Sequence, residues 1–144
     1  MTTVLIEQQD DRRLAIQLPS LHEMTDDEFF EFCQVNRDLR IERTAEGEII
    51  VMPPTGGETG NRNAKFAVQL GGWSDRDGTG EVFDSSTGFK LPNGAERSPD
   101  AAWVSHSRLA LLTAEQKRKF IPLCPDFVLE LRSPTDRLAS TQAE

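Results

Sequence analysis

A helix-start signal at Thr25 opens the first strongly periodic segment of the chain. Thr25 and Glu28 have the spacing of a capping box, in which each side chain bonds the backbone of the other residue. Phe29, Phe32 and Cys33 follow at helical spacing, with polar residues beside them. This pattern predicts a helix whose apolar side packs on the core.

Glycine and proline divide the middle of the chain into short segments. Residues 39–44 and 48–52 flank a turn-like Ala-Glu-Gly and predict a β-hairpin, which ends in a loop rich in proline and glycine. Apolar positions between 61 and 73 then fit a helix. Gly71 and Gly72 are expected to end that helix early.

The second half of the chain predicts more strands than helices. Strands are expected in four segments, namely 81–84, 87–91, 98–104 and 126–132. A basic, exposed helical piece is expected from Thr113, and a final helix from Ser133. Together these elements predict an α+β fold in which helices flank a small mixed sheet.

The length of 144 residues fits one ordinary domain with a single core. Hydrophobic residues make up 37% of the chain and charged residues 28%, which is typical of a globular protein. Residues 1–24 are polar apart from the alternating stretch 14–18, which ends at Pro19, and predict an N-terminal arm or edge strand. The domain itself is expected at 25–144.

The chain shows no targeting or membrane signal. No segment approaches the roughly 20 apolar residues of a membrane span, so the protein is expected in the cytoplasm without membrane contact.

Cys33 and Cys124 lack Cys-x-x-Cys spacing and are expected to be buried free thiols. The net charge of −8 predicts that any DNA binding is weak or metal-assisted, because clustered Lys and Arg normally contact phosphates.

Two carboxylates, Asp100 and Glu130, are the candidates for chemistry. Alternation in the strand 126–132 places Glu130 among apolar neighbours, where a carboxylate needs a metal, an arginine or water as its partner. Asp100 begins its strand beside the small residues Ala101 and Ala102, which leave the carboxylate accessible. A solvated strand face at Glu130 and ordinary Pro-Asp turn chemistry at Asp100 remain alternatives.

The acidic pair predicts a divalent-cation site if the two strands are neighbours. Two carboxylates ~5 Å apart repel each other by about 3 kcal/mol at an effective dielectric of 20, and a divalent cation reverses this penalty. Hard oxygen ligands favour Mg²⁺ or Mn²⁺ over Zn²⁺.

His22 and His106 are the only histidines, have no zinc-site spacing, and are expected at the surface. The glycine-rich segment 56–60 lacks the Gly-Lys-Ser/Thr ending of a phosphate-binding loop and predicts a turn before a helix.

The segment Ser98-Pro99-Asp100 and the run Pro-Asp-Phe-Val-Leu-Glu-Leu-Arg-Ser-Pro at 125–134 resemble the Uma-two family of putative restriction endonucleases. That family belongs to the PD-(D/E)xK nuclease superfamily. The likeness extends from about Thr25 to the end of the chain and includes the Met-Pro-Pro-Thr-Gly and Gly-Phe-Lys-Leu-Pro segments at 52–56 and 88–92. It implies a restriction-endonuclease-like core.

The resemblance also implies roles for individual residues. Asp100 and Glu130 would bind a divalent metal, Mg²⁺ or Mn²⁺, with the backbone carbonyl of Leu131 as a further oxygen ligand. Arg132 stands where the superfamily usually has lysine, and is the third catalytic candidate. Glu58 is either an outer-sphere carboxylate or an ordinary helix-start residue.

The end of the chain departs from the superfamily pattern. A strand normally follows the helix that begins near Asp136, so the domain is expected to be incomplete at its C-terminal side. In similar family members a lysine lies on that helix, near or beyond Glu144. A helix this short is marginal alone, which makes a homo-oligomer a plausible arrangement.

These observations predict a metal-dependent endonuclease that hydrolyses phosphodiester bonds in DNA. The rival hypothesis is a non-catalytic binding or scaffold protein that retains a degenerate nuclease fold. The acidic charge, the absent lysine and the short C-terminal end all favour the rival. Arg132 itself has a structural alternative, an ion pair with Asp126 or Asp136.

Overall fold

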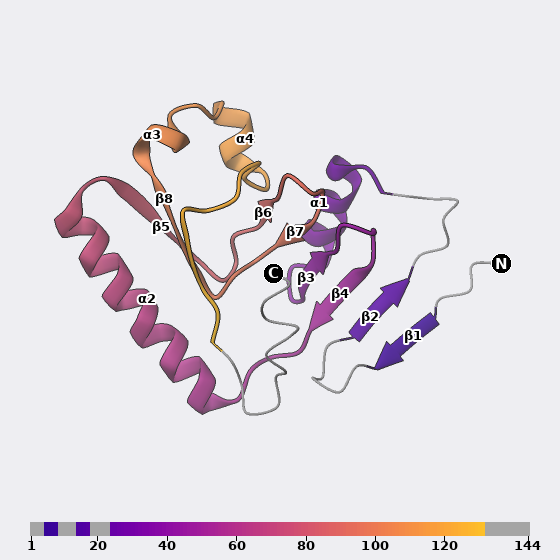
Figure 1. Ribbon diagram of the computed structural model, residues 1–144. Helices are drawn as coiled ribbons and strands as arrows, with labels where there is room; N and C mark the ends of the chain where they lie inside the picture. The colour runs from indigo at the N-terminus through magenta and orange to yellow at the C-terminus, as the bar shows by residue number, and fades with distance from the viewer. Residues whose placement is uncertain (1–4, 9–13, 18–23, 132–144) are drawn as a thin grey trace.

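The computed structural model describes residues 5–8, 14–17 and 24–131, whose strands form two sheets (Figure 1). Across the first sheet, the strands are β1 (Leu5–Gln8), β2 (Leu14–Gln17), β4 (Ile49–Met52), β3 (Arg40–Arg43), β7 (Glu96–Arg97) and β6 (Phe89–Lys90). The second sheet has the order β5 (Gly80–Asp84), β8 (Ala101–Ser105) and β9 (Phe127–Leu129). Every pairing between these strands is antiparallel.

The helices are α1 (Asp26–Val35), α2 (Gly57–Asp77), α3 (His106–Leu109) and α4 (Ala114–Arg118). The long helix α2 runs beside β5 and β8, and α1 lies near β3 on the other side of the molecule (Figure 1). The predicted α+β class is confirmed, with the strands divided between two sheets instead of gathered in one small mixed sheet. None of the helices described here is long and apolar enough to cross a membrane.

The N-terminal strands extend the first sheet. The sequence predicted an arm or edge strand at 14–18, but β2 pairs with β4 on one side and with β1 on the other. It is therefore an inner strand, because Leu5–Gln8, which has no alternating pattern and was not predicted as a strand, adds a further strand outside it.

Helix α1 begins as its sequence predicted. Thr25 Oγ1 accepts a hydrogen bond from the Glu28 amide at 3.3 Å, and the Thr25 amide donates to the Glu28 carboxylate at 2.8 Å. Phe29 is fully buried and packs with Ile41 of β3 and Ile49 of β4. This cluster is the core between α1 and the first sheet.

Helix α2 continues through Gly71 and Gly72 and ends at Asp77, so the expected early end was wrong. It also starts at Gly57, which makes the glycine-rich segment its first turn. Each interior glycine costs about 1 kcal/mol relative to alanine. Contacts beyond the two glycines offset this cost, because the Ser74 hydroxyl donates to the Gly80 carbonyl at 2.9 Å and accepts from the Trp103 indole at 3.1 Å.

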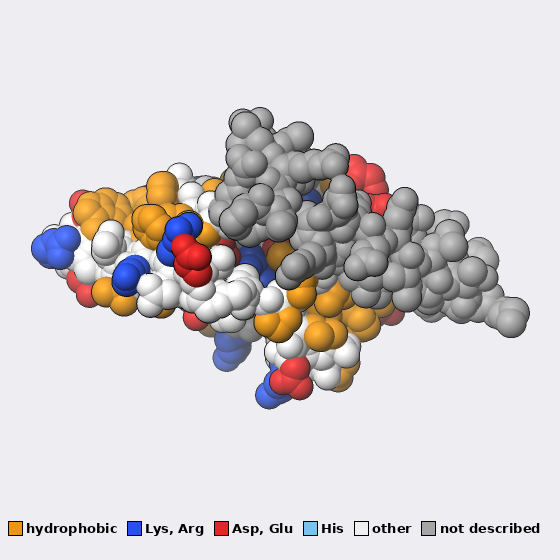
Figure 2. Space-filling model, turned by 90° about the horizontal axis from the view of Figure 1, so that it is seen from below, with side chains coloured by type: hydrophobic (Ala, Val, Ile, Leu, Met, Phe, Trp, Pro, Cys, Tyr) orange, Lys and Arg blue, Asp and Glu red, His pale blue; other side chains and the backbone are white. Residues whose placement is uncertain are grey.

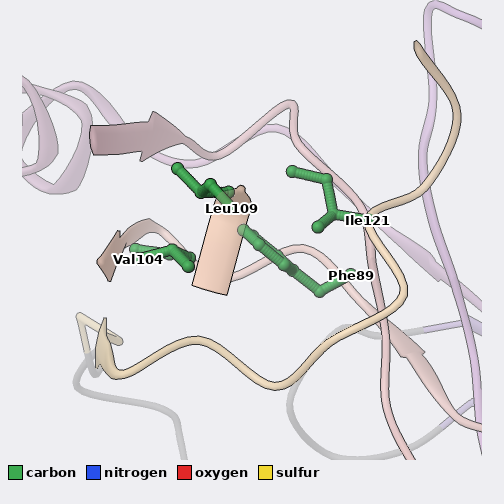
Figure 3. Packing of buried hydrophobic residues seen from close by; sticks show 5 residues of the cluster. Phe89, Val104, Leu109 and Ile121 are labelled. Carbon is green, nitrogen blue, oxygen red and sulfur yellow. The ribbon is translucent and has the colours of Figure 1, made fainter. Parts of the chain in front are cut away.

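The second core lies between the three-stranded sheet and α3. The side chains of Phe89, Val104, Leu109 and Ile121 point toward one another there (Figure 3). These four residues come from β6, β8, α3 and the segment after α4. The core therefore ties β6, a strand of the first sheet, to the second sheet.

Three strands of the second half are shorter than their sequence patterns predicted, whereas β5 is one residue longer. Strand β6 covers only Phe89–Lys90, β8 starts at Ala101 and β9 covers only Phe127–Leu129. Strand β7 was not predicted, because its two residues are charged and are held in place by pairing with β3 and β6. The final helix predicted from Ser133 lies outside the described residues.

Helix α4 has the expected exposed, basic character, and its capping box joins Thr113 to Gln116. His106 is exposed as predicted, whereas His22 lies outside the described residues.

Both cysteines are free thiols. Burial raises the pKa of the Cys33 thiol to about 11, but Cys124 is exposed, contrary to expectation, because it lies in an irregular segment between α4 and β9.

Candidate metal centre at the ends of β8 and β9

The two predicted carboxylates lie at the adjoining ends of paired strands. Ala101 of β8 stands opposite Leu129 of β9 in an antiparallel ladder, so continuing the register places Asp100 opposite Glu130. The backbone amide of Leu131 donates a hydrogen bond to Oδ2 of Asp100 at 2.8 Å. The condition for a cation site, that the two strands are neighbours, is therefore met.

Three separate parts of the chain hold the Asp100 carboxylate. Its Oδ1 accepts hydrogen bonds from Arg40 Nη1 of β3 at 3.1 Å and from Asn63 Nδ2 of α2 at 3.3 Å. Leu131, which follows β9, supplies the third donor. Asp100 is only 9% exposed, so these contacts fix its position and offset its charge.

Arg40 and Asn63 are site residues that sequence reasoning missed. Their separations from Asp100 along the chain are 60 and 37 residues, and no local pattern reports contacts over such distances. Asn63 did carry a weak signal, because it lies at helical spacing from Thr59, Ala67 and Leu70, the half-buried side of α2. A polar residue on that side of a helix needs a partner.

A buried acid supports the backbone just before Asp100. Glu42 of β3 is 3% exposed and accepts a hydrogen bond from the Ser98 amide at 2.9 Å. Arg97 Nη1 lies 3.3 Å from the same carboxylate, and Arg40 Nη2 donates to the Ser98 carbonyl. The residues between β7 and β8 are thus held by side chains from the first sheet.

The other predicted site residues are placed differently. Glu130 and Leu131 are half-buried beside Asp100 along the ladder, whereas Glu58 is exposed on the first turn of α2 and pairs with Arg62 at 2.7 Å. Arg132 lies outside the described residues. Within the described part of the chain, no group of three or more His, Cys, Asp or Glu residues could hold a metal ion. A cation here would depend on two carboxylates and backbone oxygen.

Asp126, considered as a structural partner for Arg132, has partners of its own. Arg108 Nη1 lies 2.8 Å from Asp126 Oδ1, and the Ser105 amide donates to Oδ2 at 2.9 Å. These interactions hold the pKa of the Asp126 carboxyl below its usual range, the Ser105 amide making the largest contribution. They fix the start of β9 against the end of β8.

A cleft of about 410 Å³ opens beside the carboxylate site. Two residues of this network form part of the cleft wall. They are Arg40, which donates a hydrogen bond to Asp100, and Ser98, whose carbonyl accepts one from Arg40. Arg37 and the hydroxyl-bearing Ser85 and Ser86 also line it. The cleft therefore has hydrogen-bond donors in its wall, together with the acid Asp38, and it adjoins Asp100 through Arg40.

Among the described residues visible on one face of the molecule, basic side chains are dispersed. On the face seen from below, Lys and Arg side chains form separate groups, not one continuous patch, and hydrophobic side chains lie between them (Figure 2). This distribution agrees with the net charge of −8. A long electrostatic track for nucleic acid is not visible on this face.

The fold and the site define an α+β protein with a carboxylate pair at the joined ends of two antiparallel strands. The model of the Uma2 family, described as "Putative restriction endonuclease", matches residues 26–143. The chain belongs to the Uma2 family. Comparison with curated proteins finds no match. The family assignment supports a nuclease-like function, and families with a restriction-endonuclease-like fold generally use divalent metals.

Proposed function

We propose that this protein is a metal-dependent endonuclease that hydrolyses phosphodiester bonds in DNA. The observation that carries the proposal is the hydrogen bond from the Leu131 amide to the Asp100 carboxylate at the paired ends of β8 and β9. Leu131 directly follows Glu130, so the bond brings the two candidate positions side by side. The proposed domain covers residues 25–144 and acts in the cytoplasm, with a homo-oligomer as its proposed assembly.

The donor set at this position fits a hard divalent cation. Carboxylate oxygens of Asp100 and Glu130 and the carbonyl of Leu131 are the ligand types that Mg²⁺ and Mn²⁺ prefer. Oδ2 of Asp100 accepts a hydrogen bond from a neutral amide, and a carboxylate oxygen has a second lone pair that can face a cation. In such sites a divalent cation polarises the scissile phosphate and activates a water molecule.

Each of the candidate residues has a separate role in the proposed reaction. Asp100 and Glu130 hold and orient the cation, and the Arg40 and Asn63 contacts keep Asp100 in one position before any ligand arrives. Arg132 holds a phosphate oxygen, because a guanidinium donates hydrogen bonds and cannot accept a proton. Glu58 is the proposed outer-sphere carboxylate at the start of α2, although its pairing with Arg62 also suits a simple surface role.

Substrate binding would depend on the cation more than on a basic surface. With a net charge of −8 and basic side chains in separate groups on the face of Figure 2, the protein has little long-range attraction for DNA. The cleft next to Arg40 and Ser98 is the proposed place for the sugar-phosphate backbone. Weak binding without metal is therefore expected.

A second function remains a candidate because of the same charge distribution. A protein that keeps the nuclease fold without turnover would also lack a basic DNA track and would tolerate arginine at position 132. Such a protein would act as a binding or scaffold protein. It would bind the cation or a partner without cleaving DNA.

Plasmid nicking and manganese calorimetry together test the proposal. The wild-type protein should nick supercoiled plasmid with Mg²⁺ or Mn²⁺ and bind Mn²⁺ with micromolar to millimolar affinity, and Asp100→Asn and Glu130→Gln should lose both properties. Glu81→Gln, an exposed acid toward the other end of β5, is the matched control and should retain them. Metal binding without nicking would favour the scaffold function, and equal nicking by both site variants would place the activity elsewhere.

A further inference from the structure

The inference concerns Arg40, whose guanidinium bridges the two sheets. Arg40 belongs to β3 of the six-stranded sheet, yet its Nη1 lies 3.1 Å from Oδ1 of Asp100, which precedes β8 of the other sheet. Its Nη2 donates to the Ser98 carbonyl. The side chain is 26% exposed and forms part of the wall of the adjacent cleft.

Asp100 is the acid that Arg40 contacts most closely in this network. Arg40 Nη2 lies 3.9 Å from Glu42, a longer distance than the 3.1 Å to Asp100. Glu42 also has Arg97 at 3.3 Å and the Ser98 amide at 2.9 Å as partners. The positive charge of Arg40, which is permanent, is thus directed mainly at Asp100.

We propose that Arg40 is the internal counterion of Asp100, a positioning residue that stabilises the metal-free protein and weakens metal binding at the same carboxylate. This inference rests on the proposed metal site. Without a cation, Arg40 offsets the charge of the Asp100 carboxylate and fixes its position. With a cation, the same charge lies a few ångströms from a dication and opposes it.

Arg40 is expected to raise the stability of the metal-free protein and to lower its affinity for the cation. These opposite effects distinguish a counterion from a residue that only supports the fold. A residue that only supports the fold would lower both stability and metal affinity when removed. Loss of a counterion lowers the stability of the metal-free protein and raises its affinity for the cation. The expected gain is roughly tenfold or more, because one unit charge ~6 Å from a dication, even at a dielectric near that of water, contributes about that factor.

The test measures the dissociation constant for Mn²⁺ by calorimetry, and the melting temperature with and without Mn²⁺. Arg40→Gln, which removes the charge and retains an amide donor, should melt lower without metal, bind Mn²⁺ at least about tenfold more tightly and gain more stability from Mn²⁺ than the wild type does. Arg40→Met, which fills similar space, serves the same purpose if the glutamine variant does not fold. Arg40→Lys retains the charge and should bind Mn²⁺ like the wild type.

Arg97→Gln is the matched control, because Arg97 belongs to the same network but pairs with Glu42, at 3.3 Å, and not with Asp100. It should lower the melting temperature and leave the Mn²⁺ affinity unchanged. If the wild type binds Mn²⁺ through Asp100 and Glu130 but Arg40→Gln binds it equally or more weakly, the counterion role is wrong and the metal site stands. If neither the wild type nor any Arg40 variant binds Mn²⁺, both proposals fail.

Discussion

The Asp100 carboxylate and the Leu131 amide are joined by a hydrogen bond of 2.8 Å that links the start of β8 to the residue two positions beyond β9. This contact lies at the end of a ladder whose last pair is Ala101 with Leu129. The Asp100 carboxylate is therefore held against the backbone that follows Glu130 by the protein itself. A ligand arriving here would meet an arranged set of oxygens.

Replacing Asp100 should destabilise the metal-free protein. Asp100→Ala removes the acceptor for Arg40, Asn63 and Leu131 and leaves a largely buried guanidinium without its closest acid. The free energy of unfolding, measured with urea, should fall by about 1–3 kcal/mol. Asp84→Ala, at an exposed acid of β5, is the control. Unchanged or greater stability would mean that repulsion between Asp100 and Glu130 dominates the site.

Replacing Arg132 should affect cleavage far more than stability. If Arg132 donates to the phosphate in the transition state, Arg132→Ala should lower the plasmid-nicking rate by roughly a hundredfold or more, with little change in melting temperature. Arg108→Ala is a useful comparison, because Arg108 pairs with Asp126 and should affect stability instead. Full nicking by Arg132→Ala would assign Arg132 to structure.

Glu96 should make stability depend on pH near neutrality. Its side chain is 3% exposed, and burial raises the pKa of its carboxyl to about 7, although Arg43 and Lys90 oppose the increase and Asp26 adds to it. Between pH 4.5 and about 7 the unfolded chain loses this proton and the folded protein keeps it, so stability falls as pH rises through that window. The contribution of Glu96 amounts to at most roughly 3 kcal/mol and is constant above the window.

Urea unfolding from pH 5 to pH 8 measures this contribution. Glu96→Gln keeps the shape of the side chain and cannot ionise, so its stability should fall less across the window than that of the wild type. Arg43, which lies 2.8 Å from Glu96, also pairs with Asp26 at 2.7 Å and therefore retains an acid partner in this variant. Parallel curves for the two proteins would show that Glu96 does not titrate in this range.

Ser74 should be the most sensitive position of α2. It is the one residue of this helix that is fully buried, and its hydroxyl joins the Gly80 carbonyl to the Trp103 indole. Ser74→Ala should lower the free energy of unfolding by about 2 kcal/mol, because a buried acceptor and a donor both lose their partner. Tryptophan emission reports the same change, since the ring centroids of Trp73 and Trp103 lie 5.5 Å apart. Ser107→Ala, at an exposed serine, should have little effect on either measurement.

Local signals in the sequence identified the elements that depend on neighbouring residues. The capping boxes at Thr25 and Thr113 and the hairpin around Gly47, whose φ is 88°, are set by interactions within four residues or by backbone conformation. Short motifs likewise marked Asp100 and Glu130 as candidate site residues. Those features were within reach of the sequence alone, whereas the pairing of the two strands was only a condition there and is a finding of the structure.

The remaining features depend on contacts between distant parts of the chain. Strand β7 exists because Arg43 pairs with Glu96 along the ladder and as an ion pair, and α2 passes Gly71 because Ser74 and Trp103 hold its far end. Arg40 reached the site from the other sheet. Periodicity shows which side of an element faces inward, and it does not identify the partner that the side meets.

The short crossover from Ser98 to Asp100 has a consequence for the order of folding. It links β7 of the first sheet directly to β8 of the second, and Asp100 contacts residues 60, 37 and 31 positions away. Contacts between such distant residues require large loops to close, which slows their formation. During synthesis, Arg40 leaves the ribosome long before Leu131. A nascent chain that has completed only the hairpin of β3 and β4 therefore lacks the contacts of Asp100, and these contacts would form in one of the last steps of folding.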